Sequence, residues 1–554
     1  MGTPVTSIDS ELTSLRVSVE ATSCMLPATG IIWQELGVRS YPGDFGQVIT
    51  SASNKIIGGG RSSIKGRPIT ADVSAGFEIA LQQYNLQPFL PAFFFAYAKE
   101  SGQTDPLRAG TSPAKVTGVL ADGFTGTGFT VANKFEKPPN SQLLVLARGF
   151  ALPANNGLKR VTAVTATKLS VADLVVEASP PAGAILEVVG VYQQGSTKAA
   201  FDVTNHVVTL TIDGVSTGSA NAVAPGEIIF IGADKVADNF TKSSGPVNVG
   251  FGRVGSVSAG KIVLDWTTFD PEDVPSNSAS VEVYIPTRSF YDRSVYNQIR
   301  RTTFHLERLL GYHDEEHLDS PEYPTPQSEV VKGCYANQLD ITIPDAELVT
   351  VSASFMGRGY EEREGNADNI PTSGAKAKPP VSYTGTTDNA RPIDVSEAYN
   401  STWDMVHNSL YLHQPGSTNR AKLFAYGIDG SISINNNLGT KKGYGVFGPI
   451  VVTSGDFEVQ ISLNVLFTDV TVNRTIARGD SVGLFFVLAR ENAGLAIDLP
   501  NLTIASGALT VATGEPIMIA LTNEASRSRF GHAAMISFFN YLPAISYAGD
   551  RSVC

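Results

Sequence analysis

The chain has 554 residues, of which 42% are hydrophobic and 17% are charged. This composition excludes an intrinsically disordered protein, and the length leaves room for about two to four domains, each with its own core. The 41 basic and 53 acidic residues give a net charge of −12. That balance argues against a protein that grips nucleic acid, because neutralising phosphates requires an excess of Lys and Arg.

The cysteines and the apolar segments predict a soluble protein that folds in a reducing compartment. Cys24, Cys334 and Cys554 are odd in number and far apart, so they indicate neither a disulfide framework nor a zinc site. Residues 1–10 lack the basic and apolar regions of a secretory signal. The longest apolar stretch, residues 89–98, is about half a membrane span and predicts a short core helix.

In chain order, the first recognisable element is a glycine-rich hairpin followed by a strand. Gly58, Gly59, Gly60 and Arg61 lack the Gly-Lys-Ser/Thr ending of a phosphate-binding loop, so we expect them at a hairpin tip. Residues 72–81 follow, and their alternation of apolar and polar side chains is typical of a strand with one buried face.

The middle of the chain contains an internal repeat, in which residues 155–171 align without gaps onto residues 248–264. Upstream, residues 143–147 match residues 228–231. Each unit is predicted to consist of a strand, a glycine-bearing loop, a strand, a turn and a strand. The identical pairs are Asn155/Asn248, Gly157/Gly250, Arg160/Arg253, Val161/Val254, Val164/Val257, Ala166/Ala259 and Lys168/Lys261.

The repeat predicts how the chain is divided. We expect two small β-modules, at residues 112–200 and 201–280, inserted into a larger body made of residues 1–110 and 281–554. Residues 276–280 (SNSAS) are expected to be the linker through which the chain leaves the modules. Because such an insert joins the body through closely spaced ends, deleting residues 112–280 is expected to leave a soluble core.

Residues 430–504 form a continuous block of strand signals. Between residues 456 and 467 every second residue is apolar, which predicts a strand with one buried face. Residues 431–437 alternate before it, and residues 481–490 and 496–504 are strand-like after it. The block contains no nucleophile, metal cluster or phosphate loop, so the sequence favours a structural role.

The order of these segments resembles the phage tail tube proteins of siphoviruses. The C-terminal block matches S-x-S-I-N-N-N-L, then G-D-F-E-V, then L-A-I-D-L-P-N-L-T-I in that family's order. Residues 339–357 resemble its paired strands ending in Phe-Met-Gly, and residues 45–90 resemble its N-terminal opening. Residues 226–264 resemble modules that some tail tube proteins carry, which would place the insert outside the tube.

The resemblance implies a mainly β fold: a β-sandwich or barrel body, single or duplicated, with short helices and two small inserted β-modules. It implies a structural virion protein without enzymatic activity, cofactor or metal. Such a protein folds in the host cytoplasm and assembles into stacked rings that form the tail tube, with tape measure and terminator proteins as further partners. The tube conducts double-stranded DNA during ejection, so lumen residues should lack Lys and Arg, which would hold the DNA.

Two loops are expected to contact neighbouring subunits or rings: the glycine-rich tip, and the acidic segment of residues 313–317. His313 and His317 have the i, i+4 spacing of a helical zinc site, but Asp314 stands where the general-base Glu is expected and a Pro-rich stretch follows. A solvated acidic loop is therefore the default interpretation. The candidate contact residues are Gly58, Gly59, Gly60, Arg61, His313, Asp314, Glu315, Glu316 and His317.

The number of chains in a ring is open between two arrangements. Phe77-Glu78-Ile79 resembles Phe457-Glu458-Val459, and both follow Gly-rich hairpins, which favours a duplicated body and three chains with pseudo-six-fold symmetry. A single sandwich interrupted by the insert would instead give six identical chains.

Two other classes of protein compete with the tube. A virion surface adhesin or carbohydrate-binding protein would present an exposed aromatic platform, for which Trp33, Trp266 and Trp403 give little sign. A β-rich hydrolase would need an acid/base pair with a supporting motif, and the sequence offers none.

Overall fold

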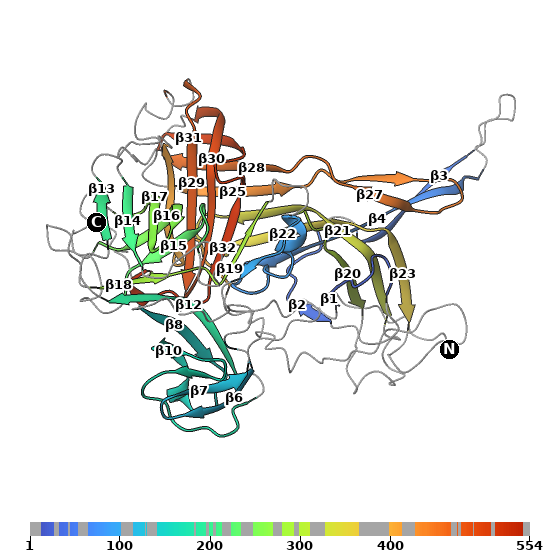
Figure 1. Cartoon of the computed structure of the whole chain (residues 1–554). Helices are drawn as coiled ribbons and strands as arrows, with labels where there is room; N and C mark the ends of the chain where they lie inside the picture. The colour runs from blue at the N-terminus through green and yellow to red at the C-terminus, as the bar shows by residue number, and fades with distance from the viewer. Residues whose placement is uncertain are drawn as a thin grey trace, which may run out of the picture.

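In the computed structural model the chain is mainly β, as the sequence predicts (Figure 1). Among the described residues no helix has the length and apolarity needed to cross a membrane. The structure describes residues 13–26, 33–42, 45–53, 65–100, 115–127, 129, 141–181, 184–194, 199–202, 207–212, 223–233, 248–269, 280–292, 299–310, 327–364, 398–412, 427–466, 474, 478–490, 492–510 and 516–546.

Seventeen of the described strands form one antiparallel body sheet, and its first half is built around the long strand β21. The N-terminal part of β21 lies between β20 and β23, and β1 pairs with β20. The C-terminal part of β21 pairs with β22, which pairs with β4. The bounds are β1 (Thr13–Val19), β4 (Arg67–Ala80), β20 (Thr303–Leu310), β21 (Gln327–Ile343), β22 (Thr350–Met356) and β23 (Gly359–Glu364).

The second half repeats this arrangement around the long strand β30. The N-terminal part of β30 lies between β29 and β32, and β24 pairs with β29. The C-terminal part of β30 pairs with β31, which pairs with β28. The bounds are β24 (Met405–Leu412), β28 (Glu458–Leu466), β29 (Val482–Arg490), β30 (Ala493–Thr510), β31 (Met518–Ala525) and β32 (Met535–Phe539).

The two halves share one topology, because the six corresponding strands also follow one another in the same order along the chain. β4 and β28 hold corresponding places. β4 contains Phe77-Glu78-Ile79, and β28 begins at Glu458 within the similar Phe457-Glu458-Val459. A hairpin lies at the start of each: β3 (Gly46–Ala52) pairs with the first part of β4, and the hairpin of β26 (Gly439–Lys442) and β27 (Pro449–Thr453) comes just before β28.

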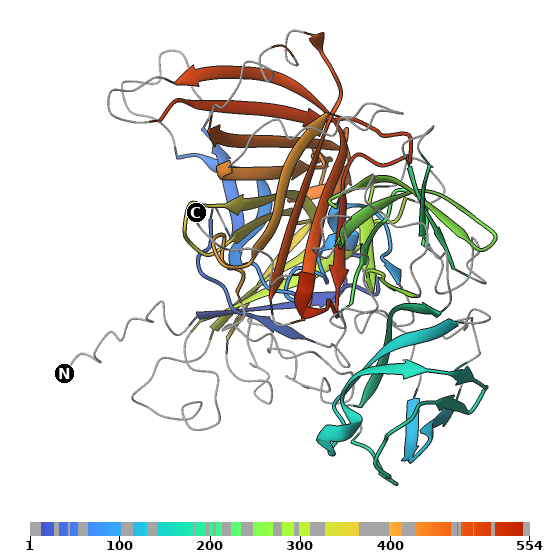
Figure 2. The same cartoon turned by 90° about the vertical axis from the view of Figure 1, so that its left-hand side faces the viewer.

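Strand β25 (Gly427–Asn435) joins the halves, because it pairs with β28 on one side and with β21 on the other. Figure 2 shows that N-terminal strands (blue) and C-terminal strands (orange and red) belong to the same body. Three short strands complete the body: β2 (Gln34–Leu36) pairs with β1, and β19 (Arg288–Tyr291) pairs with both β5 (Lys99–Glu100) and β32.

The main core lies between the layers of the body and includes the short helix α1 (Leu90–Phe93). This confirms the core helix expected within residues 89–98. Four aromatic rings meet there: the centroid of Phe89 lies 5.1 Å from that of Phe77 and 5.4 Å from that of Phe304, and Phe355 stacks on Phe77.

The asparagine-rich corner after β25 fixes α1 to the sheet. Asn436 is 1% exposed, and its side-chain amide donates hydrogen bonds to the carbonyl oxygens of Phe93 and Ala336, each 3.0 Å away. Asn437 has φ +46°, a left-handed conformation that Asn tolerates better than most residues, and its side chain donates to Asp456. The corner therefore needs Asn because a short amide satisfies buried backbone groups.

Residues 115–284 build two further sheets with a repeated topology. In the first unit β8 pairs with β9 and β12, and β11 pairs with β10 and β7. In the second unit β15 pairs with β16 and β18, and β17 pairs with β16 and β14. The single strand β16 of the second unit corresponds to two strands of the first unit, β9 and β10. Register shifts in β16 lie where β9 ends and β10 begins in the first unit.

Strands β12 and β18 hold corresponding places in the two units and pair with each other, so the units meet about an approximate two-fold axis. The bounds are β6 (Lys115–Leu120), β7 (Gly123–Thr127), β8 (Ser141–Arg148), β9 (Gly157–Val161), β10 (Ala163–Val164), β11 (Lys168–Ser170), β12 (Ile185–Gln194), β13 (Ala199–Asp202), β14 (Val207–Thr211), β15 (Ile228–Ile231), β16 (Gly250–Ser258), β17 (Lys261–Thr267) and β18 (Ser280–Tyr284).

The chain returns to the body later than the sequence predicts. Residues 281–286 were expected to resume the main fold, but β18 pairs with β12 and β15 and so belongs to the nine-stranded sheet of the insert. The first strand to rejoin the body is β19. The physical reason is that Val281 and Val283 alternate into the core of the insert, where both are 1% exposed.

The insert shares a hydrophobic core with the second half of the body. Phe251 and Trp266 of the second unit pack against Phe485 of β29, with ring centroids 5.9 Å and 4.8 Å apart, and Trp266 stacks on Tyr411 of β24. The same cluster contains Leu144, Leu146, Val189, Ile228, Phe230, Val487, Ala496, Met535 and Phe539. The outer face of β29 and β30 is therefore covered by the insert.

A buried ion cluster lies in this interface. Arg253 of β16 is 0% exposed, with its Nε 3.2 Å from Asp265 and its NH1 3.4 Å from Asp498 of β30, and it donates to the Tyr411 hydroxyl. Burial raises the pKa of Asp498 to about 6, although the nearby Arg253 acts in the opposite direction. The corresponding Arg160 of the first unit instead pairs with Glu282 of β18, between the two units.

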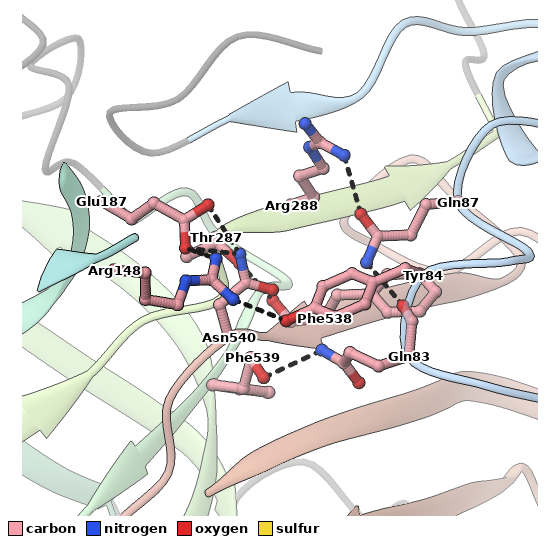
Figure 3. A network of polar contacts seen from close by, with 10 residues as sticks. All are labelled: Gln83, Tyr84, Gln87, Arg148, Glu187, Thr287, Arg288, Phe538, Phe539 and Asn540. Carbon is pink, nitrogen blue, oxygen red and sulfur yellow. Dashed lines mark hydrogen bonds and ion pairs between the residues drawn. The ribbon is translucent and has the colours of Figure 1, made fainter. Parts of the chain in front are cut away.

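A second polar network links the insert to both halves of the body (Figure 3). Arg148 of β8 pairs with the fully buried Glu187 of β12 and donates to the Tyr84 hydroxyl at 2.8 Å. Glu187 also accepts hydrogen bonds from the side chain of Asn540 at 3.0 and 3.1 Å. Gln83 completes the junction by donating to the carbonyl oxygen of Phe539 at 3.0 Å.

This shared core changes the expected result of deleting the insert. Residue 100 lies opposite Arg288 in the β5–β19 pair, so a short linker closes the gap. However, deletion of residues 101–287 uncovers Tyr411, Phe485 and Phe539, and an apolar face of this kind promotes association. We expect the deleted protein to aggregate in light scattering at micromolar concentration.

The matched control is the same deletion with Phe485→Ser, Val487→Thr and Phe539→Ser, which should restore solubility by making the uncovered face polar. A plain deletion that remains monodisperse and binds no hydrophobic dye would contradict the shared-core interpretation.

The N-terminal strand is held by a buried carboxylate. The Glu20 side chain lies 2.8 Å from His305 Nδ1, and it accepts hydrogen bonds from the Thr303 hydroxyl and the Gly333 amide, each at 2.6 Å. Burial tends to raise the pKa of Glu20, but the hydrogen bonds and the histidine outweigh it, and the pKa lies below its usual value.

Replacing Glu20→Gln is expected to lower the free energy of unfolding at pH 7 by about 3 kcal/mol, because it leaves buried donors without their charged acceptor. A lowered carboxyl pKa contributes stability above its unfolded value, and that contribution is lost as the pH falls through the folded value. Chemical denaturation from pH 7 downward should therefore show the difference between wild type and variant shrinking in acid. Glu524→Gln, at an exposed carboxylate of β31, should show no such trend.

Candidate functional site

The candidate site is one face of a layer of the body, which we call the inner layer, formed by β4, β22, β21, β25, β28, β31 and the C-terminal part of β30. Alternate residues of these strands, such as Phe77, Leu339 and Ile461, point into the main core. The residues between them lie on the opposite face, where most of them are polar and partly or fully exposed. This alternation is the two-residue period of a strand with one wet face.

The polar face contains a continuous row that crosses seven strands. Each member lies directly opposite the next in the register of the paired strands. The row consists of Glu78, Ser352, Asp340, Ser433, Gln460, Glu524 and Thr503.

Hydrogen bonds between neighbouring strands order this face. Gln338 donates to both carboxylate oxygens of Asp340 at 3.0 Å and to the Ser433 hydroxyl at 3.3 Å, across the β21–β25 pair that joins the halves. On the next pair, the side-chain amide of Asn464 donates to Asp429 at 2.7 Å.

The face carries acidic groups without basic ones. Residues 74–80, 338–343, 350–356, 427–435, 458–466, 502–510 and 518–525 of these strands contain no Lys or Arg. They do contain five carboxylates: Glu78, Asp340, Asp429, Glu458 and Glu524. A surface of this composition repels a polyanion and offers it no ion pair.

The sequence found the strands of this site but not its candidate contact residues. Gly58, Gly59, Gly60 and Arg61 follow β3 in the chain, and His313, Asp314, Glu315, Glu316 and His317 follow β20; all nine lie outside the described residues. Among the residues that are described, no cluster of His, Cys, Asp and Glu could hold a metal ion.

Sequence reasoning missed the polar row itself. The alternation in residues 458–466 shows which residues are polar, but only the register between strands shows that β4 and β31 contribute to the same face. The available signal was the absence of Lys and Arg from residues 74–80, 338–343, 350–356, 427–435, 458–466, 502–510 and 518–525 of these strands.

The tryptophans form no aromatic platform in the part of the chain described here. Trp33 and Trp266 are each 4% exposed, and Trp403 is 65% exposed.

Comparison with protein families matches residues 10–525 to the family described as phage tail tube protein. The chain belongs to the phage tail tube protein family. The matched region includes both halves of the body and the insert between them. A comparison with curated protein sequences finds no match. The tail tube protein described here is thus a structural protein of the virion tail, as the resemblance implied.

Proposed function

We propose that this tail tube protein assembles into stacked rings whose lumen is lined by the polar face, and that the lumen conducts double-stranded DNA during ejection. The observation that carries the proposal is the polar row across seven strands in segments free of Lys and Arg. DNA that meets no fixed cations releases no counterions on contact and is therefore not held. The protein acts without catalysis, and tape measure and terminator proteins are its expected tail partners.

The strand pair that joins the two halves of one chain indicates how neighbouring chains would pair in a ring. Within one chain, the C-terminal part of β21 pairs with β25, from Gln338–Asn435 to Ile343–Gly430. In the second half, the strand that corresponds to β21 is β30. Residues 503–510 of β30 pair with β31 on one side, and β31 is their one strand partner within the part of the chain that the structure describes. In the first half the segment beside β4, where Ser40 bridges Glu78, corresponds to β25. Ring closure would place β30 of one chain beside residues 39–42 and 45–52 of the next.

This arrangement favours three chains per ring over six. Each chain supplies two halves of the same topology, so three chains present six equivalent wall segments. The body (residues 1–110 and 281–554) would form the wall, and the two β-modules (112–200 and 201–280, with the second extended through β18) would lie outside it. The apolar core that the modules share with the body lies on the second half, so the modules would mark every other wall segment.

We expect electron microscopy of tails or assembled tubes to show three outer projections per ring, with six-fold density confined to the wall. The reason is that each chain carries one insert and two wall halves. Six equivalent projections per ring would contradict the trimer and indicate six chains.

The lumen assignment predicts the effect of added positive charge. Ser433→Lys with Gln460→Lys places two ammonium groups opposite each other on β25 and β28. Tubes should assemble, because both positions are on the wet face, but ejection followed by DNA fluorescence should be slowed, and salt should relieve the defect.

The matched control is Ser433→Glu with Gln460→Glu, which changes the same positions without attracting phosphate. If the lysine and glutamate variants eject DNA at the same rate at every salt concentration, the polar face is not the lumen.

A further inference from the structure

The outer edge of the second half is closed by a strand that comes from the first half. β19 precedes β20 in the chain, and it pairs antiparallel with β32 of the second half. The Arg288 guanidinium at the start of β19 donates to Gln87, which follows β4, at 2.8 Å. The Thr287 hydroxyl donates to the Phe538 carbonyl oxygen at 3.0 Å. The two halves of one chain are therefore joined in the outer layer by β19, as they are joined in the inner layer by β25.

The corresponding edge of the first half has no such strand among the described residues. β23 holds the place of β32, and its one strand partner there is β21. The two places can be equated because the register shifts fall at matching points of the two halves, in the β20–β21 and β29–β30 pairs and again in the β21–β22 and β30–β31 pairs. An unpaired strand edge presents backbone donors and acceptors that readily pair with another strand.

The second half contains the segment that would correspond to β19. β19 belongs to the connection from β4 to β20, and the matching connection runs from β28 to β29, residues 467–481, of which the structure describes residues 474 and 478–481. In the sequence of this connection Val470 and Val472 alternate with polar residues, which is the period of a strand with one buried face. By sequence and by place in the chain, it is the counterpart of β19.

The charges of the β23 edge and of this connection are complementary. Glu362 of β23 is exposed and lies directly opposite Glu329 of β21. The Tyr360 hydroxyl lies 2.9 Å from the Glu329 carboxylate and 3.3 Å from that of Glu362. In the connection, Arg474 and Arg478 are both exposed. An acidic edge and a basic connection attract each other and disfavour a wrong register.

We propose that the open edge of β23 receives the connection between β28 and β29 of a second copy of this chain, the neighbour in the same ring. This inference rests on the proposed ring and adds a contact in the outer layer to the pairing of β30 in the inner layer. The partner is a second copy because one chain has two edges of this kind and fills only that of β32 by itself.

The direction of the contact agrees with that of the inner layer. Within one chain the first half gives β19 to the second half, so in the ring the second half would give its connection to the first half of the next chain. Each chain then gives one segment and receives one, and closure of the ring leaves neither β23 nor β32 as an open edge.

Charge reversal across this contact tests the proposal. Glu362→Lys places a cation opposite Arg474 and Arg478, and Arg474→Glu with Arg478→Glu places two carboxylates opposite Glu362. Either variant should form rings with an affinity weakened by about tenfold or more, measured by sedimentation over a concentration series. One chain that carries all three substitutions should form rings like wild type, because the contact again joins opposite charges.

The matched control is Lys261→Glu, an exposed charge reversal on β17 of the insert, which should form rings like wild type. Since Glu362, Arg474 and Arg478 are exposed, the melting temperature of the dissociated chains should not change. Rings that form as readily in both reversed variants as in wild type, or a triple variant as weak as either of them, would overturn the β23 contact and leave the ring proposal standing. A wild-type protein that forms no rings in electron microscopy would overturn the ring proposal, and the β23 contact with it.

Discussion

The body depends on two long strands that each belong to two layers. β21 leaves β20 for β22 near Tyr335, and β30 leaves β29 for β31 near Leu502. Register shifts lie at both transfers, between Ala336 and Gln338 and between Ile504 and Ser506. An extra residue bends a strand and increases its twist, so one continuous backbone carries the polar inner layer and the outer layer of each half.

The halves have the same topology but different outer faces. The face of β29 and β30 is apolar and packs against the insert through Phe485, Val487 and Ala496. The corresponding face of β20 carries His305 and Glu307, with Arg16 of β1 opposite Glu307. Burial of aromatic surface against Phe251 and Trp266 therefore selects one half as the docking site of the insert, and the Arg253 cluster fixes its register because a buried guanidinium requires its carboxylates.

Much of this architecture was predictable from the sequence, and the reasons are local. The alternation in residues 456–467 and the strand signals of residues 481–490 correspond to β28 and β29, since a half-buried strand leaves a period of two. The point where the chain returns to the body was predicted too early, because the alternating Val281 and Val283 fit a strand of either sheet. The docking face was missed because a fully buried strand such as β29 has no alternation to show which neighbour covers it, and the polar row depends on register between residues hundreds of positions apart.

In the proposed ring, the duplicated body would have a genetic consequence. When one gene encodes one wall segment, every substitution is repeated at every position around a ring, and a change useful in one place is imposed on all. Here Phe485 on β29 can dock an insert while the corresponding strand β20 keeps charged residues, because the two are encoded separately. A tube of the proposed kind could specialise alternate faces of its exterior while selection holds its interior uniform.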